Sequence, residues 1–101
     1  MNRKKVREMV GGEPYEYFPL GKFIVCAPGI CRGRPTFKYT RIEPASALDL
    51  LGAGYSIDYV VESFQGRVPR DAVMEAIDLA AKAFWKEGKA FSKQMAQASG
   101  R

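Results

Sequence analysis

The sequence predicts a small α+β domain in which a pair of β-strands precedes three helices. Residues 22–27 and 36–42 are short β-branched and apolar runs separated by a loop rich in Gly, Pro and Arg, which is the pattern of two linked strands. Residues 60–84 show apolar spacings of three and four on both sides of a Gly-containing turn, which is typical of two successive helices. A chain of 101 residues is enough for one such domain.

Three helices are expected, at about residues 45–53, 56–64 and 69–86. Pro44 suits the first turn of the first helix, and Gly54 suits its left-handed C-terminal cap. Ser56 is a favourable N-cap for the second helix. Gly66 can turn the chain at positive φ, and Pro69 then suits the first turn of the third helix. Two helices joined by so tight a turn resemble a helix-turn-helix, although the same pattern is common in helical cores that bind no DNA.

The ends of the chain are expected to differ from this domain, which we place at residues 13–87. Residues 1–12 are basic and are predicted to form a flexible leader. Residues 88–101 are also basic and are predicted to form either a tail or an extension of the last helix. Between Pro14 and Pro19 two tyrosines alternate with a glutamate, which fits a short or edge strand.

Charge is distributed unevenly along the chain, whose formal net charge is +5. Residues 1–41 hold nine Lys and Arg against three Asp and Glu, whereas residues 42–81 hold two against seven. Residues 82–101 hold five bases against one acid. The segment that most resembles a DNA-reading motif is therefore acidic, and the basic residues that would meet phosphate lie on either side of it.

Several functional classes are disfavoured by what the sequence lacks. It has no histidine, so no Ser-His or Cys-His pair can form, and it has no phosphate-binding glycine loop; we expect no enzyme and no catalytic residue. Cys26 and Cys31 are too few for a zinc site, so neither a metal nor a cofactor is expected. No apolar run approaches the ~20 residues that span a bilayer, and no secretory signal is present. A soluble cytoplasmic protein is expected.

Residues 24–84 carry four motifs in one order, namely Pro28-Gly29-Ile30-Cys31, Gly33-Arg34-Pro35, Thr40-Arg41-Ile42 and Gly54-Tyr55-Ser56. With the alanine-rich last helix, they resemble the domain-of-unknown-function family 433. The resemblance implies a strand pair followed by a homeodomain-like, helix-turn-helix bundle, and an antitoxin of the VapB type encoded beside a PIN-like ribonuclease toxin. Tyr39 stands where the family usually has glycine; if that glycine serves a positive-φ turn, a straighter strand is expected here.

The first functional hypothesis is an antitoxin or autoregulator that binds its own promoter DNA through the helix-turn-helix. The second helix of such a pair presents its N-terminal side chains to base edges. The candidates are Arg70, Asp71, Met74 and Glu75, with Arg70 as the best partner for guanine and Arg67 in the turn for phosphate. Arg32, Arg34 and Lys38 would add contacts to phosphate. Asp71 and Glu75 have an equally good role in offsetting the helix dipole. A homodimer is expected, because one small module makes a small interface with DNA.

The alternative hypothesis is a protein-interaction module without sequence-specific DNA binding, either a toxin-neutralising subunit or a dimeric scaffold. A PIN-like toxin has a carboxylate cluster that an arginine such as Arg32 or Arg34 could occupy. An exposed aromatic and basic helix also fits a groove on a partner. The candidate contact residues at the end of the chain are Trp85, Lys86, Lys89, Phe91 and Lys93.

Overall fold

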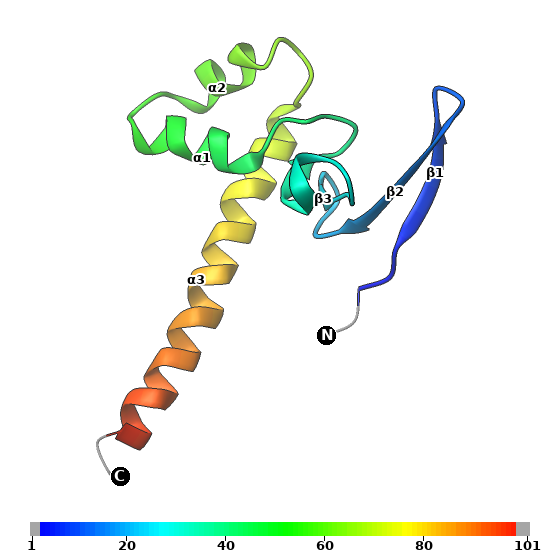
Figure 1. Cartoon of the computed structure of the whole chain (residues 1–101). Helices are drawn as coiled ribbons and strands as arrows, with labels where there is room; N and C mark the ends of the chain where they lie inside the picture. The colour runs from blue at the N-terminus through cyan, green and yellow to red at the C-terminus, as the bar shows by residue number, and fades with distance from the viewer. Residues whose placement is uncertain (1–2, 99–101) are drawn as a thin grey trace.

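A computed structural model describes residues 3–98 and places a four-stranded antiparallel sheet before three helices (Figure 1). The elements are β1 (Val6–Val10), β2 (Glu13–Pro19), β3 (Ile24–Cys26), β4 (Pro35–Phe37), α1 (Pro44–Gly52), α2 (Ile57–Ser63) and α3 (Arg70–Ala98), with a short 3-10 turn at Cys31–Gly33. The α+β class and the order of strands before helices are confirmed. The sheet has four strands: β3 and β4 are the predicted pair, β2 is the strand expected between Pro14 and Pro19, and β1 was not expected.

The first two strands form a hairpin that the prediction of a flexible leader missed. Val10 pairs with Glu13, so the connection contains only Gly11 and Gly12. Both glycines have positive φ, +59° and +81°, which is what the two central residues of a type I′ hairpin turn require. The expected flexible leader is therefore wrong for residues 6–10, which are ordered as β1 by pairing with β2.

The last strand is shorter than expected, because the chain turns directly after Phe37. The Thr40 hydroxyl donates to the Phe37 carbonyl at 2.8 Å and accepts the Ile42 N–H at 3.0 Å, closing a tight turn. Tyr39 lies inside this turn with φ of +67°. The expectation of a straighter strand at Tyr39 is therefore wrong: the tyrosine adopts the left-handed conformation that glycine adopts more easily.

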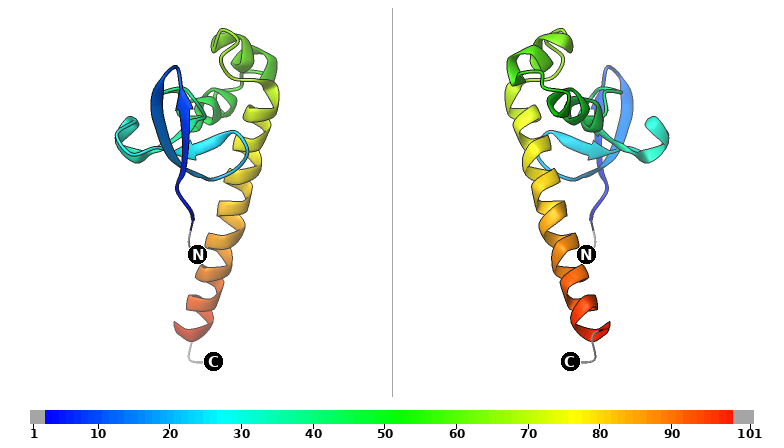
Figure 2. Two further views of the ribbon diagram at one scale, coloured as in Figure 1. Left: turned by 90° about the vertical axis from the view of Figure 1, so that its right-hand side faces the viewer. Right: turned by 90° about the vertical axis from the view of Figure 1, so that its left-hand side faces the viewer.

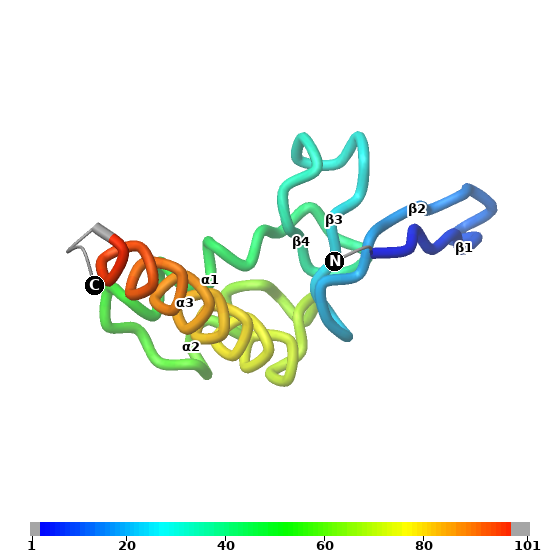
Figure 3. The backbone as a smooth tube through the Cα atoms, turned by 90° about the horizontal axis from the view of Figure 1, so that it is seen from below, coloured from blue at the N-terminus to red at the C-terminus, as the bar shows by residue number. Residues whose placement is uncertain are grey.

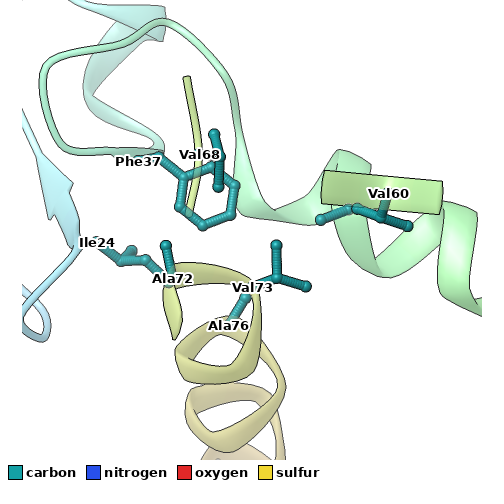
Figure 4. Close-up of a cluster of buried hydrophobic side chains, with 8 residues drawn as sticks. Ile24, Phe37, Val60, Val68, Ala72, Val73 and Ala76 are labelled. Atoms are coloured by element: carbon teal, nitrogen blue, oxygen red, sulfur yellow. The ribbon is translucent and has the colours of Figure 1, made fainter. Parts of the chain in front are cut away.

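The helices pack on β3 and β4 through one apolar core (Figure 4). Ser56 caps α2 by accepting the Tyr59 N–H at 3.1 Å, as its sequence position predicted. The buried side chains of this core are Ile24, Phe37, Ala47, Val60, Val68, Ala72, Val73 and Ala76. Because three of them lie in the first two turns of α3, that end of the helix is fixed against both the sheet and the other helices.

The rest of α3 extends away from this core. The helix has 29 residues, and Figure 2 shows its second half running beyond every other element. In Figure 3, which is seen from below, α3 and the β1–β2 hairpin lie on opposite sides of the molecule. The radius of gyration is 16.6 Å, against about 13 Å for a compact chain of this length. Of the two alternatives for the end of the chain, the structure has the helix extension as far as residue 98; the last three residues lie outside the described part. Within residues 3–98, no helix is both long and apolar enough to cross a membrane.

Candidate nucleic-acid interface and helical arm

Three cationic side chains from separate segments meet beside the start of α3. Lys22 precedes β3, Lys38 follows β4, and Arg67 lies in the turn before α3; all three line a groove of about 420 Å³. We call these three residues the basic groove. The N-terminus of α3 adds partial positive charge at the same place, because its first N–H groups have no partners within the helix. The arrangement favours an anion such as a phosphate.

Arg67 also borders a second groove on the neighbouring surface. This hollow has a volume of about 330 Å³, and its lining includes Arg41, Tyr15 and Tyr39. Within residues 3–98, the side chains of Lys22, Arg41 and Arg67 form no ion pair. Their positive charge is therefore not offset by a contacting carboxylate. The tyrosine rings beside them offer flat surfaces on which a base or sugar can pack.

Lys38, by contrast, is held by a polar network that joins the hairpin to the turn after β4. Its ammonium lies 3.3 Å from Glu8 and over the rings of Tyr17 and Tyr39. Both tyrosine hydroxyls donate to Glu8, that of Tyr39 at 2.6 Å, and the Tyr39 N–H donates to the Tyr15 hydroxyl at 3.1 Å. These contacts, above all that with the Tyr17 hydroxyl, raise the pKa of Lys38. Lys38 is therefore less available to a ligand than Lys22 or Arg67.

The same network predicts a pH dependence of stability. Hydrogen bonds from Tyr17 and Tyr39 are the largest causes that lower the pKa of Glu8 below its ordinary value of 4.5. A carboxyl whose pKa is depressed on folding stabilises the protein above its unfolded pKa and loses that contribution as pH falls through the folded pKa. The midpoint of thermal unfolding should therefore be higher for the wild type than for Glu8→Gln at pH 7, and the difference should shrink steadily below about pH 4.

Glu13→Gln is the matched control, because Glu13 is an exposed carboxylate in the same hairpin. Its unfolding midpoint should follow that of the wild type closely across the pH range. A Glu8→Gln difference that stays constant between pH 7 and pH 3 would contradict the assignment.

The leading end of α3 presents three of the predicted DNA-reading residues to solvent. Arg70 and Asp71 are exposed, and Met74 is 45% exposed. Arg70 forms an ion pair with Asp58 of α2, but both side chains are more than half exposed, so the pair contributes little and can be exchanged for another anion. Asp58 and Asp71 place negative charge at this end. Reading of bases here would depend on Arg70, with Arg67 beside it for phosphate.

Glu75 has a different role from the base contact expected of it. One oxygen accepts the Lys22 N–H at 2.8 Å, and the other accepts the N–H groups of Phe23 at 2.8 Å and Ile24 at 3.1 Å. The carboxylate thus links α3 to the beginning of β3 and holds the Lys22 backbone beside the basic groove. Because its carboxylate already accepts three hydrogen bonds, Glu75 is not available to contact a base and is not one of the base-reading residues.

The two loop arginines do not join the basic groove. Arg34 forms a two-pronged contact with Glu43, at 2.9 and 3.1 Å, and this pair borders a largely apolar pocket between α1 and α3. Arg32 is exposed in the 3-10 turn at φ of +56°. The three residues predicted to contact phosphate therefore do not lie together: Lys38 lines the basic groove, whereas Arg32 and Arg34 lie elsewhere.

The predicted partner-binding residues all lie on the free part of α3. We define the arm as residues 81–97, every one of which is exposed. Phe84 is 80% exposed, Trp85 74%, Phe91 56% and Met95 54%. The apolar spacing of residues 60–84 included Phe84 in the face predicted to be buried, but the core ends about one turn earlier. The same arm exposes the three lysines that were predicted to contact a partner protein, Lys86, Lys89 and Lys93.

Two residues that line the groove, Lys22 and Tyr39, were not predicted from the sequence as site residues. Lys22 was treated as the first residue of a strand, and Tyr39 as a strand residue. Lys22 follows Gly21 in a turn where the N–H groups of Leu20 and Gly21 both donate to the Ile24 carbonyl. The signal that could have found it is the Leu-Gly-Lys sequence directly before an apolar run, which is as consistent with a turn as with a strand start.

These features define an α+β domain with a basic groove and an extended helical arm. Residues 24–80 match the family model described as a protein of unknown function (DUF433). The match covers more than half of the chain, so the chain belongs to this family. No curated protein and no solved structure gives a significant match. Among residues 3–98, no group of three or more Cys, Asp or Glu side chains lies close enough together to hold a metal ion.

Proposed function

We propose that this chain is an antitoxin-like, autoregulatory DNA-binding protein in which α2 and α3 act as a homeodomain-like helix-turn-helix. The observation that carries the proposal is the basic groove beside the exposed start of α3. Lys22 and Arg67 would grip the phosphate backbone there, while Arg70 at the helix start would face a base edge in the major groove. Neighbouring residues would thus have two different roles: Lys22 and Arg67 would position the DNA backbone, and Arg70 would recognise the base sequence.

The proposal predicts a specific change in salt dependence. The duplex to use is the region upstream of the protein's own gene. In a fluorescence-anisotropy titration, log Kd should rise steeply with log salt, and Arg67→Ala should weaken binding about 5- to 10-fold and reduce that slope by about 1. Arg70→Ala should instead weaken binding to this duplex more than to an unrelated duplex, because it would remove a base contact.

Lys89→Ala is the matched control for charge. It also removes one positive charge from an exposed side chain, but from the arm and not from the groove. Its binding should stay within about twofold of wild type. Equal losses for Lys89→Ala and Arg67→Ala would mean that binding follows net charge alone, and no binding of the wild type at low salt would remove the DNA function.

A second candidate function is a protein-interaction module that does not read DNA, such as the neutralising partner of a PIN-like toxin. The observation that favours it is the charge at the exposed start of α3, where Asp58 and Asp71 accompany Arg70. Carboxylates close to phosphates are repelled. Purification of the protein with the product of the adjacent gene, together with absence of DNA binding, would favour this candidate.

A further inference from the structure

An apolar stripe begins at Ile77 and continues along the arm, where nothing among residues 3–98 covers it. Its members recur at alternating intervals of four and three residues: Ile77, Ala81, Phe84, Gly88, Phe91 and Met95. This is the heptad spacing of a helix that packs lengthwise against another helix. Ile77 is half-buried yet absent from the core cluster, and all the others are exposed. The stripe thus begins where the core face ends and continues along the whole arm.

We propose that the arms of two copies of this chain pair with each other, and that they run antiparallel. Large and small residues alternate along the stripe in a way that suits only that direction. When Phe84 of one copy lies opposite Gly88 of the other, Phe91 lies opposite Ala81, and Met95 lies opposite Ile77. Each aromatic ring then meets a small residue, whereas a parallel pair would set Phe84 against Phe84 and leave a void at Gly88.

Charge placement favours a second copy over an acidic groove on another protein. The four lysines of the arm are Lys82, Lys86, Lys89 and Lys93, and at 100° per residue they lie on the side of the helix opposite the stripe. Whatever covers the stripe therefore does not meet the lysines, as in a two-helix pair whose outer positions are polar. An acidic groove on another protein would instead require the lysines to lie next to the stripe, where they could contact the rim of that groove.

The exposed area of the stripe fits a weak, concentration-dependent dimer. At roughly 150–250 Å² for each fully exposed large side chain, the exposures of Phe84, Phe91 and Met95 leave on the order of 400 Å² of uncovered surface on one arm. Two arms together present about 800 Å², which is below the ~1,000 Å² of a stable interface, so the pairing should be weak. The pairing does not depend on the proposed function, because it needs no nucleic acid.

Sedimentation of the purified full chain without DNA tests the proposal. The wild type should move from monomer toward dimer as its concentration rises through the micromolar range, and added salt should change association little, because the lysines of the two copies lie on outer faces. Phe91→Glu should weaken association at least about tenfold, as expected for loss of a central aromatic contact. Lys93→Glu introduces the same residue on the opposite face and should leave the dimer intact.

Circular dichroism of each variant separates loss of pairing from loss of folding, since the core lies outside the arm. A wild type that remains monomeric at every concentration would overturn the proposal and leave the stripe to a different protein. A dimer that tolerates Phe91→Glu, or one that weakens with salt, would overturn it as well.

Disulfide trapping tests the direction of pairing. Ala81→Cys is introduced into a chain whose Cys26 and Cys31 are replaced by serine. In the antiparallel arrangement the two residues at position 81 are about 15 Å apart along the rod, beyond the ~7 Å that a disulfide spans, so the dimer should not cross-link. Rapid cross-linking at position 81 would show a parallel pair and overturn the antiparallel assignment.

Discussion

Replacement of Glu75 by alanine is expected to lower the free energy of unfolding by about 2–4 kcal/mol. The change removes the acceptor of three backbone N–H groups, those of Lys22, Phe23 and Ile24. A hydrogen bond to a charged group contributes about 1.5–3 kcal/mol, and a buried donor left without a partner costs about 1–3 kcal/mol. Lys22 is exposed and its N–H can turn to water, so the loss comes mainly from Phe23 and Ile24. Urea denaturation followed by circular dichroism measures it.

Glu87→Ala serves as the control, since Glu87 is an exposed glutamate of the same helix. It should change the unfolding free energy by less than about 0.5 kcal/mol. Glu75→Gln should lie between wild type and Glu75→Ala, because the amide keeps one acceptor oxygen. If Glu75→Ala were as stable as Glu87→Ala, the carboxylate would not join α3 to β3.

The same contact can be tested from the other side through Gly21. A Cβ atom at this position would lie 2.5 Å from one carboxylate oxygen of Glu75 and 2.9 Å from the other. Gly21→Ala should therefore displace the carboxylate and lose much of the same stability. In the Glu75→Ala background the obstruction is absent, so Gly21→Ala should cost little. Clearly additive losses in this double-mutant cycle would contradict the direct contact.

Local signals explain why the helices were predictable from the sequence. Pro44 begins α1, the Ser56 hydroxyl caps α2, and Gly66 turns the chain at φ of +77° before α3. Each of these acts within a few residues of its own position, so its effect can be read from neighbouring letters. The hairpin at Gly11 and Gly12 carried an equally local signal, but the basic residues around it suggested a disordered end.

The missed parts of the candidate site depend on contacts between distant segments. Glu75 lies on a helix start, where a carboxylate offsets the helix dipole equally well, and only its 2.8 Å distance to the Phe23 N–H shows its other role. Lys22 and Arg67 are 45 positions apart in the sequence and meet only because α3 packs on β3. Exposure of Phe84 was also hidden, because a helix shows the same periodicity on a covered face and on an uncovered one.

Phe37→Ala is expected to lower the free energy of unfolding by about 3–5 kcal/mol, the largest loss of any single change considered for this chain. The Phe37 side chain is 2% exposed, and its ring centre lies 6.2 Å from that of Phe64. Its neighbours come from the sheet and the helices alike (Figure 4), so no single element can move to fill the cavity. A small domain is stable by only about 5–15 kcal/mol in total.

Phe84→Ala removes the same atoms from a side chain that is 80% exposed. Measured by urea denaturation at a concentration where both proteins are monomeric, it should change the unfolding free energy by less than about 0.5 kcal/mol. The two variants remove the same phenyl ring and differ only in whether that ring is buried. The difference between their unfolding free energies therefore measures the effect of burial. If monomeric Phe84→Ala lost as much stability as Phe37→Ala, the second half of α3 would have to be packed against the core, and the arm would not be free to meet a second copy.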